Sequence, residues 1–173
     1  MELKNVFAKR VSVRAYKETQ ISDEQLQAIL DAAYQAPVAM GQYENSTLIV
    51  MQDADALKQL NTICSEKAGK PGMAPSYGAP TVIFVCQKAD MEDILMGANA
   101  GTIMQNMLLA ATEQGLGSCF LFGMTQMTYT DETVKQIIGV PEGFRTVSAI
   151  AVGYPQEETA ERAIDRDKIR TLR

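Results

Sequence analysis

Two arginines flank a serine near the amino terminus, in the run Arg10-Val11-Ser12-Val13-Arg14. In an extended chain, side chains at alternate positions point the same way, with neighbours about 7 Å apart. Two guanidinium groups around a hydroxyl would surround a phosphate, because the planar donors of arginine bind its oxygens in a bidentate manner. A helix would turn Ser12 away from the arginines, and the β-branched valines favour the extended form. A solvated basic edge that makes surface ion pairs is the alternative interpretation.

Histidine is absent from the chain, and its three cysteines, Cys64, Cys86 and Cys119, form no C-x-x-C pair. The lack of imidazole excludes Ser-His-Asp and Cys-His nucleophilic sites and most zinc sites, so we expect no metal centre. Cys86 and Cys119 stand in apolar runs, which favours buried small hydrophobic residues over a redox pair. An odd, scattered cysteine count without a signal peptide predicts a reducing, cytoplasmic location.

Length, composition and charge restrict the class of protein. With 173 residues, 46% of them hydrophobic and 21% charged, we expect a single globular domain over residues 1–173. The net charge of -5 argues against nucleic acid as a partner, although one basic cluster stands at each end of the chain. The most apolar stretch, from Met96 to Ala111, is interrupted by Asn99, Gln105 and Asn106, so we expect no membrane span.

Helical and strand patterns are mixed along the chain. Ser22 followed by Gln25 predicts a capping box at the start of a second helix, and residues 90–114 form the longest helix, apolar nearly all round. Further helices are predicted over 3–7, 53–66 and 130–138, the last capped by Thr130, and strands over 47–51, 81–86, 118–122 and 146–152. Residues 68–78 are rich in Gly and Pro and indicate a loop. The pattern is typical of an α/β or α+β class around one sheet of at least four strands.

The motif R-x-S-x-R-x-Y, from Arg10 to Tyr16, resembles the opening signature of the nitroreductase family. Other blocks follow in the family's order: residues 36–42, similar to its A-P-S-x-x-N-x-Q loop; 98–111, like its central dimer helix; then 115–118, 139–143 and 151–155. No single block is specific, but the ordered set covers almost the whole chain. The resemblance implies a nitroreductase-like α+β fold (α/β mixed), with a central, mostly antiparallel sheet flanked by helices, in an intertwined homodimer.

The resemblance also implies an FMN cofactor at the interface between the two subunits. The phosphate and ribityl contacts that carry over are Arg10, Val11, Ser12 and Arg14; the loop over the ring edge carries over to Pro37, Val38, Ala39 and Gln42. Leu121, Phe122 and Gly123 match backbone positions beside the reactive N5 of the ring, and Arg166, in the C-terminal basic cluster, matches a further phosphate contact. Such a site needs no catalytic side chain of its own, because FMN carries the electrons.

The implied reaction transfers hydride from NADH or NADPH through FMN to a small organic acceptor, such as a nitroaromatic or a quinone. Loop 68–78, with Met73 and Met124, is a candidate lining of the acceptor slot, and ordinary core packing is the alternative for both methionines. A helix that is apolar on all sides has more surface than one small core covers, which independently favours a dimer.

The sequence departs from the family pattern in two places. Gly41 replaces the asparagine of the family's loop, and Tyr43-Glu44 replaces its Pro-Trp. No obvious lysine stands where the family commonly faces N1 and O2 of the flavin, so Lys67 and Lys70 are the nearby substitutes. These departures support an alternative function, an FMN-binding module with little or no turnover. A binder of another phosphorylated metabolite rests on the arginine pair alone.

Overall fold

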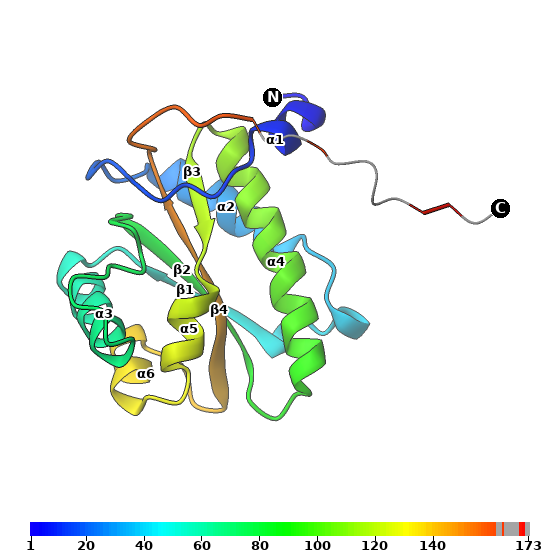
Figure 1. Cartoon of the computed structure of the whole chain (residues 1–173). Helices are drawn as coiled ribbons and strands as arrows, with labels where there is room; N and C mark the ends of the chain where they lie inside the picture. Colours follow the sequence, from blue (N-terminus) through cyan, green and yellow to red (C-terminus); the bar gives the residue numbers. More distant parts are fainter. Residues whose placement is uncertain (162–163, 165–169, 172–173) are drawn as a thin grey trace.

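A four-stranded antiparallel sheet forms the centre of the molecule (Figure 1), in the computed structural model that describes residues 1–161, 164 and 170–171. The strands are β1 (Ser46–Met51), β2 (Thr81–Lys88), β3 (Gly117–Phe120) and β4 (Phe144–Gly153). Their order is β1-β2-β4-β3, and each neighbouring pair is antiparallel. The predicted mixed class and antiparallel sheet are therefore confirmed, and β3 lies at one edge.

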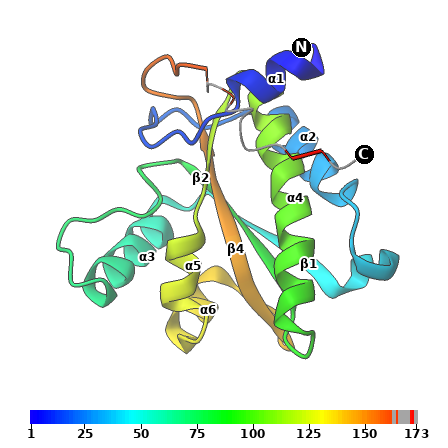
Figure 2. The same cartoon turned by 45° about the vertical axis from the view of Figure 1, so that its right-hand side comes forward.

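Helices cover both faces of this sheet (Figures 1 and 2). One face is covered by α2 (Asp23–Tyr34) and α4 (Asp93–Glu113), and the other by α3 (Ala54–Lys67), α5 (Phe122–Thr128) and α6 (Glu132–Ile138). The short helix α1 (Leu3–Lys9) packs against α4. Two 3-10 turns, η1 (Ala39–Gly41) and η2 (Tyr43–Asn45), connect α2 to β1. No helix in the described ranges is long and apolar enough to cross a bilayer.

Strand β2 shows why both faces of the sheet must be covered. Val82 and Phe84 point into the core beneath α3, whereas Ile83 and Val85 point into the core beneath α4. Successive side chains of a strand point to opposite faces, so a continuously apolar strand needs a packing layer on each side. The apolar run predicted over residues 81–86 therefore identifies a central strand.

Two predicted helix boundaries are also confirmed. The Ser22 hydroxyl accepts from the Gln25 N–H at 3.2 Å, and the Gln25 side chain accepts from the Ser22 N–H at 3.0 Å, which completes the capping box of α2. Gly115 follows the end of α4 with a φ of +76°, a left-handed conformation that glycine adopts without strain.

Two other predictions are wrong. The strand expected over residues 118–122 ends at Phe120, and α5 begins at Phe122. Gly123 is a poor helix former. Helix α5 is instead stabilised because three of its own side chains, Met124, Thr125 and Thr128, are buried. The last predicted helix, α6, is capped by Asp131 rather than Thr130, because the Asp131 carboxylate accepts from the Val134 N–H at 3.1 Å.

Candidate functional site

The segment that carries the arginine pair is extended, as predicted, and the structure places it beside edge strand β3. Ser12 pairs with Ser118 in a parallel bridge, and the Val13 N–H donates to the Ser118 carbonyl at 3.0 Å. Gly117 permits this close approach, because a Cβ at that position would lie 2.9 Å from the Val13 side chain. The contact with β3 therefore fixes where the segment lies.

Side chains of this segment alternate between the core and the surface. Val13 is buried, whereas Ser12 and Arg14 are exposed and Arg10 is half-buried; Val11 is also half-buried. Within the described ranges, no carboxylate forms an ion pair with either arginine.

The pKa of the Cys119 thiol on β3 depends on burial and on the three polar side chains of this segment. Burial raises the pKa of Cys119. Arg14, a hydrogen bond with Ser12, and Arg10 each oppose this rise in the pKa. Two arginines that form no ion pair with the described residues, with a serine hydroxyl between them in the sequence, fit a phosphate group.

The hydroxyl of Ser118 is an orphaned polar group at the same place. Ser118 is 1% exposed, and its Oγ has no hydrogen-bond partner among the residues that the structure describes. A buried hydroxyl without a partner costs about 1–3 kcal/mol, which a polar ligand or a water would recover. The residues of this site therefore fit a ligand that carries both phosphate and hydroxyl groups, as FMN does.

Tyr77 lies against Arg14 from the loop that follows α3. The guanidinium carbon of Arg14 is 5.9 Å from the centre of the Tyr77 ring, within the range of a cation–π contact. Tyr77 also has a φ of +56°, which is rare for an aromatic residue and is typical of functional sites. No motif in the sequence indicates Tyr77, because both features depend on the three-dimensional path of the loop.

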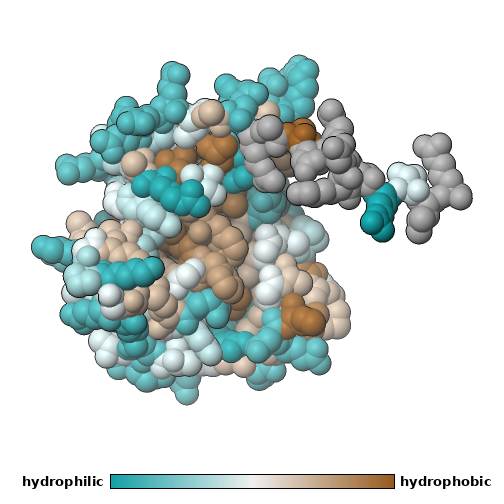
Figure 3. Space-filling model, in the orientation of Figure 1, coloured by the Kyte–Doolittle hydropathy of each residue, from teal (hydrophilic) through white to brown (hydrophobic). Residues whose placement is uncertain are grey.

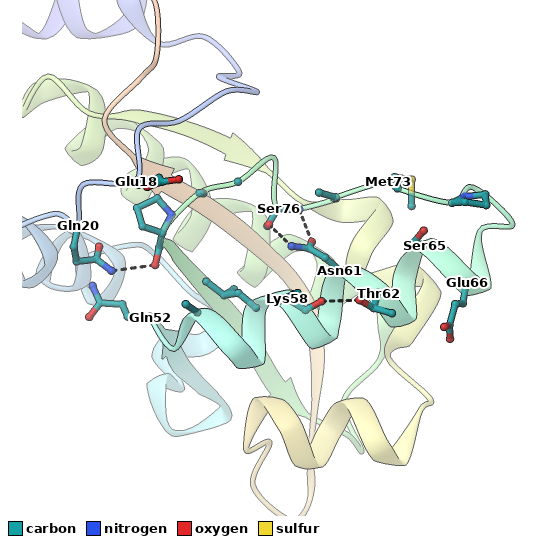
Figure 4. A pocket seen from close by; sticks show the side chains of 18 of the residues that line it. Glu18, Gln20, Gln52, Lys58, Asn61, Thr62, Ser65, Glu66, Met73 and Ser76 are labelled. Carbon is teal, nitrogen blue, oxygen red and sulfur yellow. Dashed lines mark hydrogen bonds between the residues drawn. The ribbon is translucent and has the colours of Figure 1, made fainter.

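A cavity of about 1010 Å³ lies between α3 and the same loop (Figure 4). Ser76 and Gly78 line this cavity, whereas the ring of the intervening Tyr77 faces Arg14. Asn61 of α3 holds the loop in place: its Nδ2 donates to the Ser76 hydroxyl at 2.8 Å, and its Oδ1 accepts from the Ser76 N–H at 3.1 Å. The loop therefore separates the cavity from the arginine pair.

The methionines and lysines expected near the flavin lie in different places. Met73 lines the cavity, whereas Met124 is 3% exposed and packs in the core, as the core-packing alternative predicts. Helix α5, which the sequence patterns do not indicate, turns Met124 inward. Lys67 forms an ion pair with Asp131 at 2.8 Å, and Lys70 is exposed. Lys67 is therefore bound to the start of α6.

Loop 37–42 is held by the polar side chains of α4. The Thr102 hydroxyl donates to the Pro37 carbonyl at 2.8 Å, and the Asn99 Oδ1 accepts from the Ala39 N–H at 2.8 Å. At the tip, Met40 is 78% exposed and has a φ of +56°. Of the predicted contact residues, Pro37 is exposed, and Val38, Ala39 and Gln42 are half-buried. Figures 1 and 2 both show α4 between this loop and the arginine segment, so one chain does not bring them together.

Leu121, Phe122 and Gly123 stand where β3 ends and α5 begins. Leu121 is buried and its N–H donates to the Ala149 carbonyl at 2.8 Å, whereas Phe122 and Gly123 are exposed. Helix α5 has no side-chain cap, so the first N–H groups of α5 have no hydrogen-bond partner in the part of the chain that is described. Figure 3 shows apolar surface near the centre of this face, around the end of β3, where Phe120 is 46% exposed and Phe122 is 53% exposed.

Edge strand β3 thus connects two of the three groups of predicted FMN contacts, the arginine segment and residues 121–123. Ser118, beside the arginine segment, and Leu121, beside α5, are about 10 Å apart along an extended chain. The third group, loop 37–42, lies elsewhere on the same chain. Arg166, the preferred residue of the C-terminal basic cluster, lies outside the described residues.

The nitroreductase family model matches residues 7–78 and 73–154 of the chain. A protein of Archaeoglobus fulgidus described as an NADH dehydrogenase/NAD(P)H nitroreductase is 32% identical over 90% of this chain and 86% of its own length. The chain belongs to the nitroreductase family. This membership confirms the resemblance stated above and makes the chain an oxidoreductase.

Two solved nitroreductases with bound FMN have the same fold as this family member. The protein of Desulfitobacterium hafniense gives a TM-score of 0.90 and that of Bacteroides fragilis 0.88, each at 26% identity. The alignments cover 100% of this chain, with 99% of the D. hafniense chain and 100% of the B. fragilis chain. The predicted nitroreductase-like fold is therefore confirmed for the residues that the structure describes.

Proposed function

We propose that this member of the nitroreductase family binds FMN and transfers hydride from NADH or NADPH to a small organic acceptor such as a nitroaromatic or a quinone. The similar D. hafniense and B. fragilis proteins contain bound FMN, and the A. fulgidus relative is described as using NAD(P)H. One structural observation carries the proposal. The Arg10-Ser12-Arg14 segment and the start of α5, which has no side-chain cap among the described residues, lie along one edge strand, β3.

In this proposal, the two ends of β3 bind opposite ends of the cofactor. Arg10 and Arg14 bind the phosphate through charge-assisted hydrogen bonds, and Ser12 adds a hydroxyl between them. Tyr77 stacks on Arg14 and limits the conformations of its guanidinium group. In the same proposal, Arg166 in the C-terminal basic cluster is a further phosphate contact.

At the other end, the backbone at Phe122 and Gly123 orients the ring. Among the described residues, no side chain caps the start of helix α5 there, so its first N–H groups can donate to a polar edge of the ring. Backbone donors on a helix that is packed against the sheet are rigid, which keeps the ring in one orientation. When bound, FMN supplies the hydride chemistry, and the chain supplies binding, orientation and electrostatics.

We further propose a homodimer in which loop 37–42 of one subunit covers the flavin bound to its partner. Helix α4 separates this loop from the arginine pair of its own chain (Figure 1), so it is the partner's loop that reaches the ring. Exposed apolar side chains support a dimer interface, among them Met40 at 78% and Ile94 at 80%. Contact between two copies would remove this apolar area from water.

Purification and an anaerobic titration test the proposed activity. We expect a yellow protein, or one that turns yellow on addition of FMN, that loses its visible flavin absorption when NADH or NADPH is added. The departures at Gly41, Tyr43 and Glu44 favour the alternative of a flavin-binding module. In that case the protein would be yellow but would keep its absorption with both donors. A protein that binds no FMN would refute both functions.

A further inference from the structure

Three polar side chains interrupt the apolar surface of α4. All three bind backbone atoms of residues 32–39, where α2 ends and loop 37–42 begins. Asn99, Thr102 and Asn106 follow a spacing of three and four residues, which puts them on one face of the helix. Their partners are the Ala39 N–H, the Pro37 carbonyl and the Ala32 carbonyl, at 2.8, 2.8 and 2.9 Å respectively. The first two bonds hold loop 37–42, whereas the third holds α2. The polar face of α4 therefore contains separate anchors for the loop and for the helix before it.

Asn99 belongs to a hydrogen-bonded chain that continues through the core. Its Nδ2 donates to the Gln87 Oε1 at 3.4 Å, and the Gln87 Nε2 donates to the Ser46 hydroxyl at 2.8 Å. Asn99 is 3% exposed and Gln87 is 0% exposed, so neither amide has water as an alternative partner.

The chain of bonds has one direction. A backbone N–H only donates, so the Ala39 N–H requires the oxygen of Asn99 to face the loop. The Asn99 nitrogen then faces the Gln87 oxygen, and the Gln87 nitrogen faces Ser46. Bonds aligned in this way polarise one another, and breaking any of them leaves a buried polar group unpaired. The position of loop 37–42 is thus linked to β1 and β2 through Asn99.

We propose that Asn99 is a positioning residue for cofactor binding: it holds loop 37–42 in the conformation that contacts the flavin of the partner subunit. The inference rests on the proposed function, because it assumes that the loop covers FMN. Asn99 itself touches neither flavin nor substrate and acts through the Ala39 N–H. A loop already held in its bound conformation loses less conformational entropy on contact with the ring.

Asn99→Leu tests the proposal, with Asn106→Leu as the matched control. Both variants replace an amide on α4 by a side chain of similar size and remove one bond to a neighbouring backbone atom. We expect Asn99→Leu to raise the Kd for FMN about tenfold, which corresponds to about 1.4 kcal/mol. We expect Asn106→Leu to keep the Kd within about twofold, even if thermal melting shows an equal loss of stability. The visible circular dichroism of bound FMN should change only in Asn99→Leu.

Ala39→Pro removes the same bond from the side of the loop, which keeps the test decisive if Asn99→Leu fails to fold. Val38 has φ -122° and ψ 157°, a conformation compatible with a following proline. We expect this variant to raise the Kd for FMN about tenfold. The double variant should add little, because both changes break the same hydrogen bond between Ala39 and Asn99.

The outcomes separate this inference from the proposed function. If the unmodified protein does not quench the fluorescence of added FMN, the proposed function fails and the inference fails with it. If the unmodified protein binds FMN but Asn99→Leu and Asn106→Leu have equal Kd values, only the inference is overturned. An unchanged Kd in Ala39→Pro would also overturn it, whereas a selective effect of both loop-anchor variants supports it.

Discussion

Replacement of both Arg10 and Arg14 by alanine removes the proposed phosphate site. Hydrogen bonds to charged groups contribute about 1.5–3 kcal/mol each, so the loss of two guanidinium groups raises the Kd for FMN by at least about 100-fold. The fold should change little, since neither arginine has an ion-pair partner within the described ranges. The double variant also removes the cation–π interaction between Arg14 and Tyr77, worth about 0.5–1 kcal/mol, or a melting shift of about 2–4 °C at most.

The assay titrates apo protein with FMN and follows the quenching of flavin fluorescence, with thermal melting measured in parallel. Arg10→Lys combined with Arg14→Lys keeps the charge but loses bidentate binding. Its Kd for FMN should therefore lie between that of the unmodified protein and that of the double-alanine variant. Arg145→Ala is the matched control, because Arg145 pairs with Asp93 and lies near Tyr129, away from β3. A folded double-alanine protein with an unchanged Kd would refute the phosphate assignment.

Three further predictions concern the loop, the edge strand and the thiols. Tyr77→Leu should raise the Kd for FMN about two- to fivefold in the same titration, because it removes a cation–π contact of about 0.5–1 kcal/mol with Arg14; an unchanged Kd would show that Tyr77 does not orient Arg14. Gly117→Ala should lower the free energy of unfolding in urea by about 1–3 kcal/mol and weaken FMN binding, since its Cβ would lie 2.9 Å from Val13; a neutral result would contradict the close approach to β3. Burial raises the pKa of Cys86 from 9.0 to about 12, so this thiol stabilises the fold fully below pH 9 and loses that contribution as the pH rises toward 12. Between pH 8 and pH 10, the free energy of unfolding in urea should fall less in Cys86→Ala than in the unmodified protein. Equal losses would show that Cys86 does not contribute to the pH dependence of stability.

Periodicity and capping signals in the sequence were enough to predict most of the fold. The apolar run over residues 81–86 predicts β2 because both faces of a central strand are buried. Ser22 and Gln25 predict the start of α2 because the capping box depends only on local spacing. Helix α5 could not be predicted, because tertiary burial of Met124 outweighs the weak helix propensity of its sequence.

The candidate site was also predictable only in part from the sequence. Alternation of Arg10, Ser12 and Arg14 is a local property, and the structure confirms that the segment is extended. The placement of Tyr77 over Arg14 could not be predicted, because it depends on the path of a loop that is far away in the sequence. Asn99 did carry a signal, as a polar residue inside an apolar helix. Its partner in loop 37–42 becomes apparent only in three dimensions.

Anaerobic reduction of the purified protein with FMN bound tests the central claim most directly. We predict that NADH or NADPH abolishes the visible absorption of the bound flavin, and that a quinone or a nitroaromatic added afterwards restores it. A protein that binds FMN but keeps its absorption with both donors, or one that binds no FMN, would contradict the proposed activity.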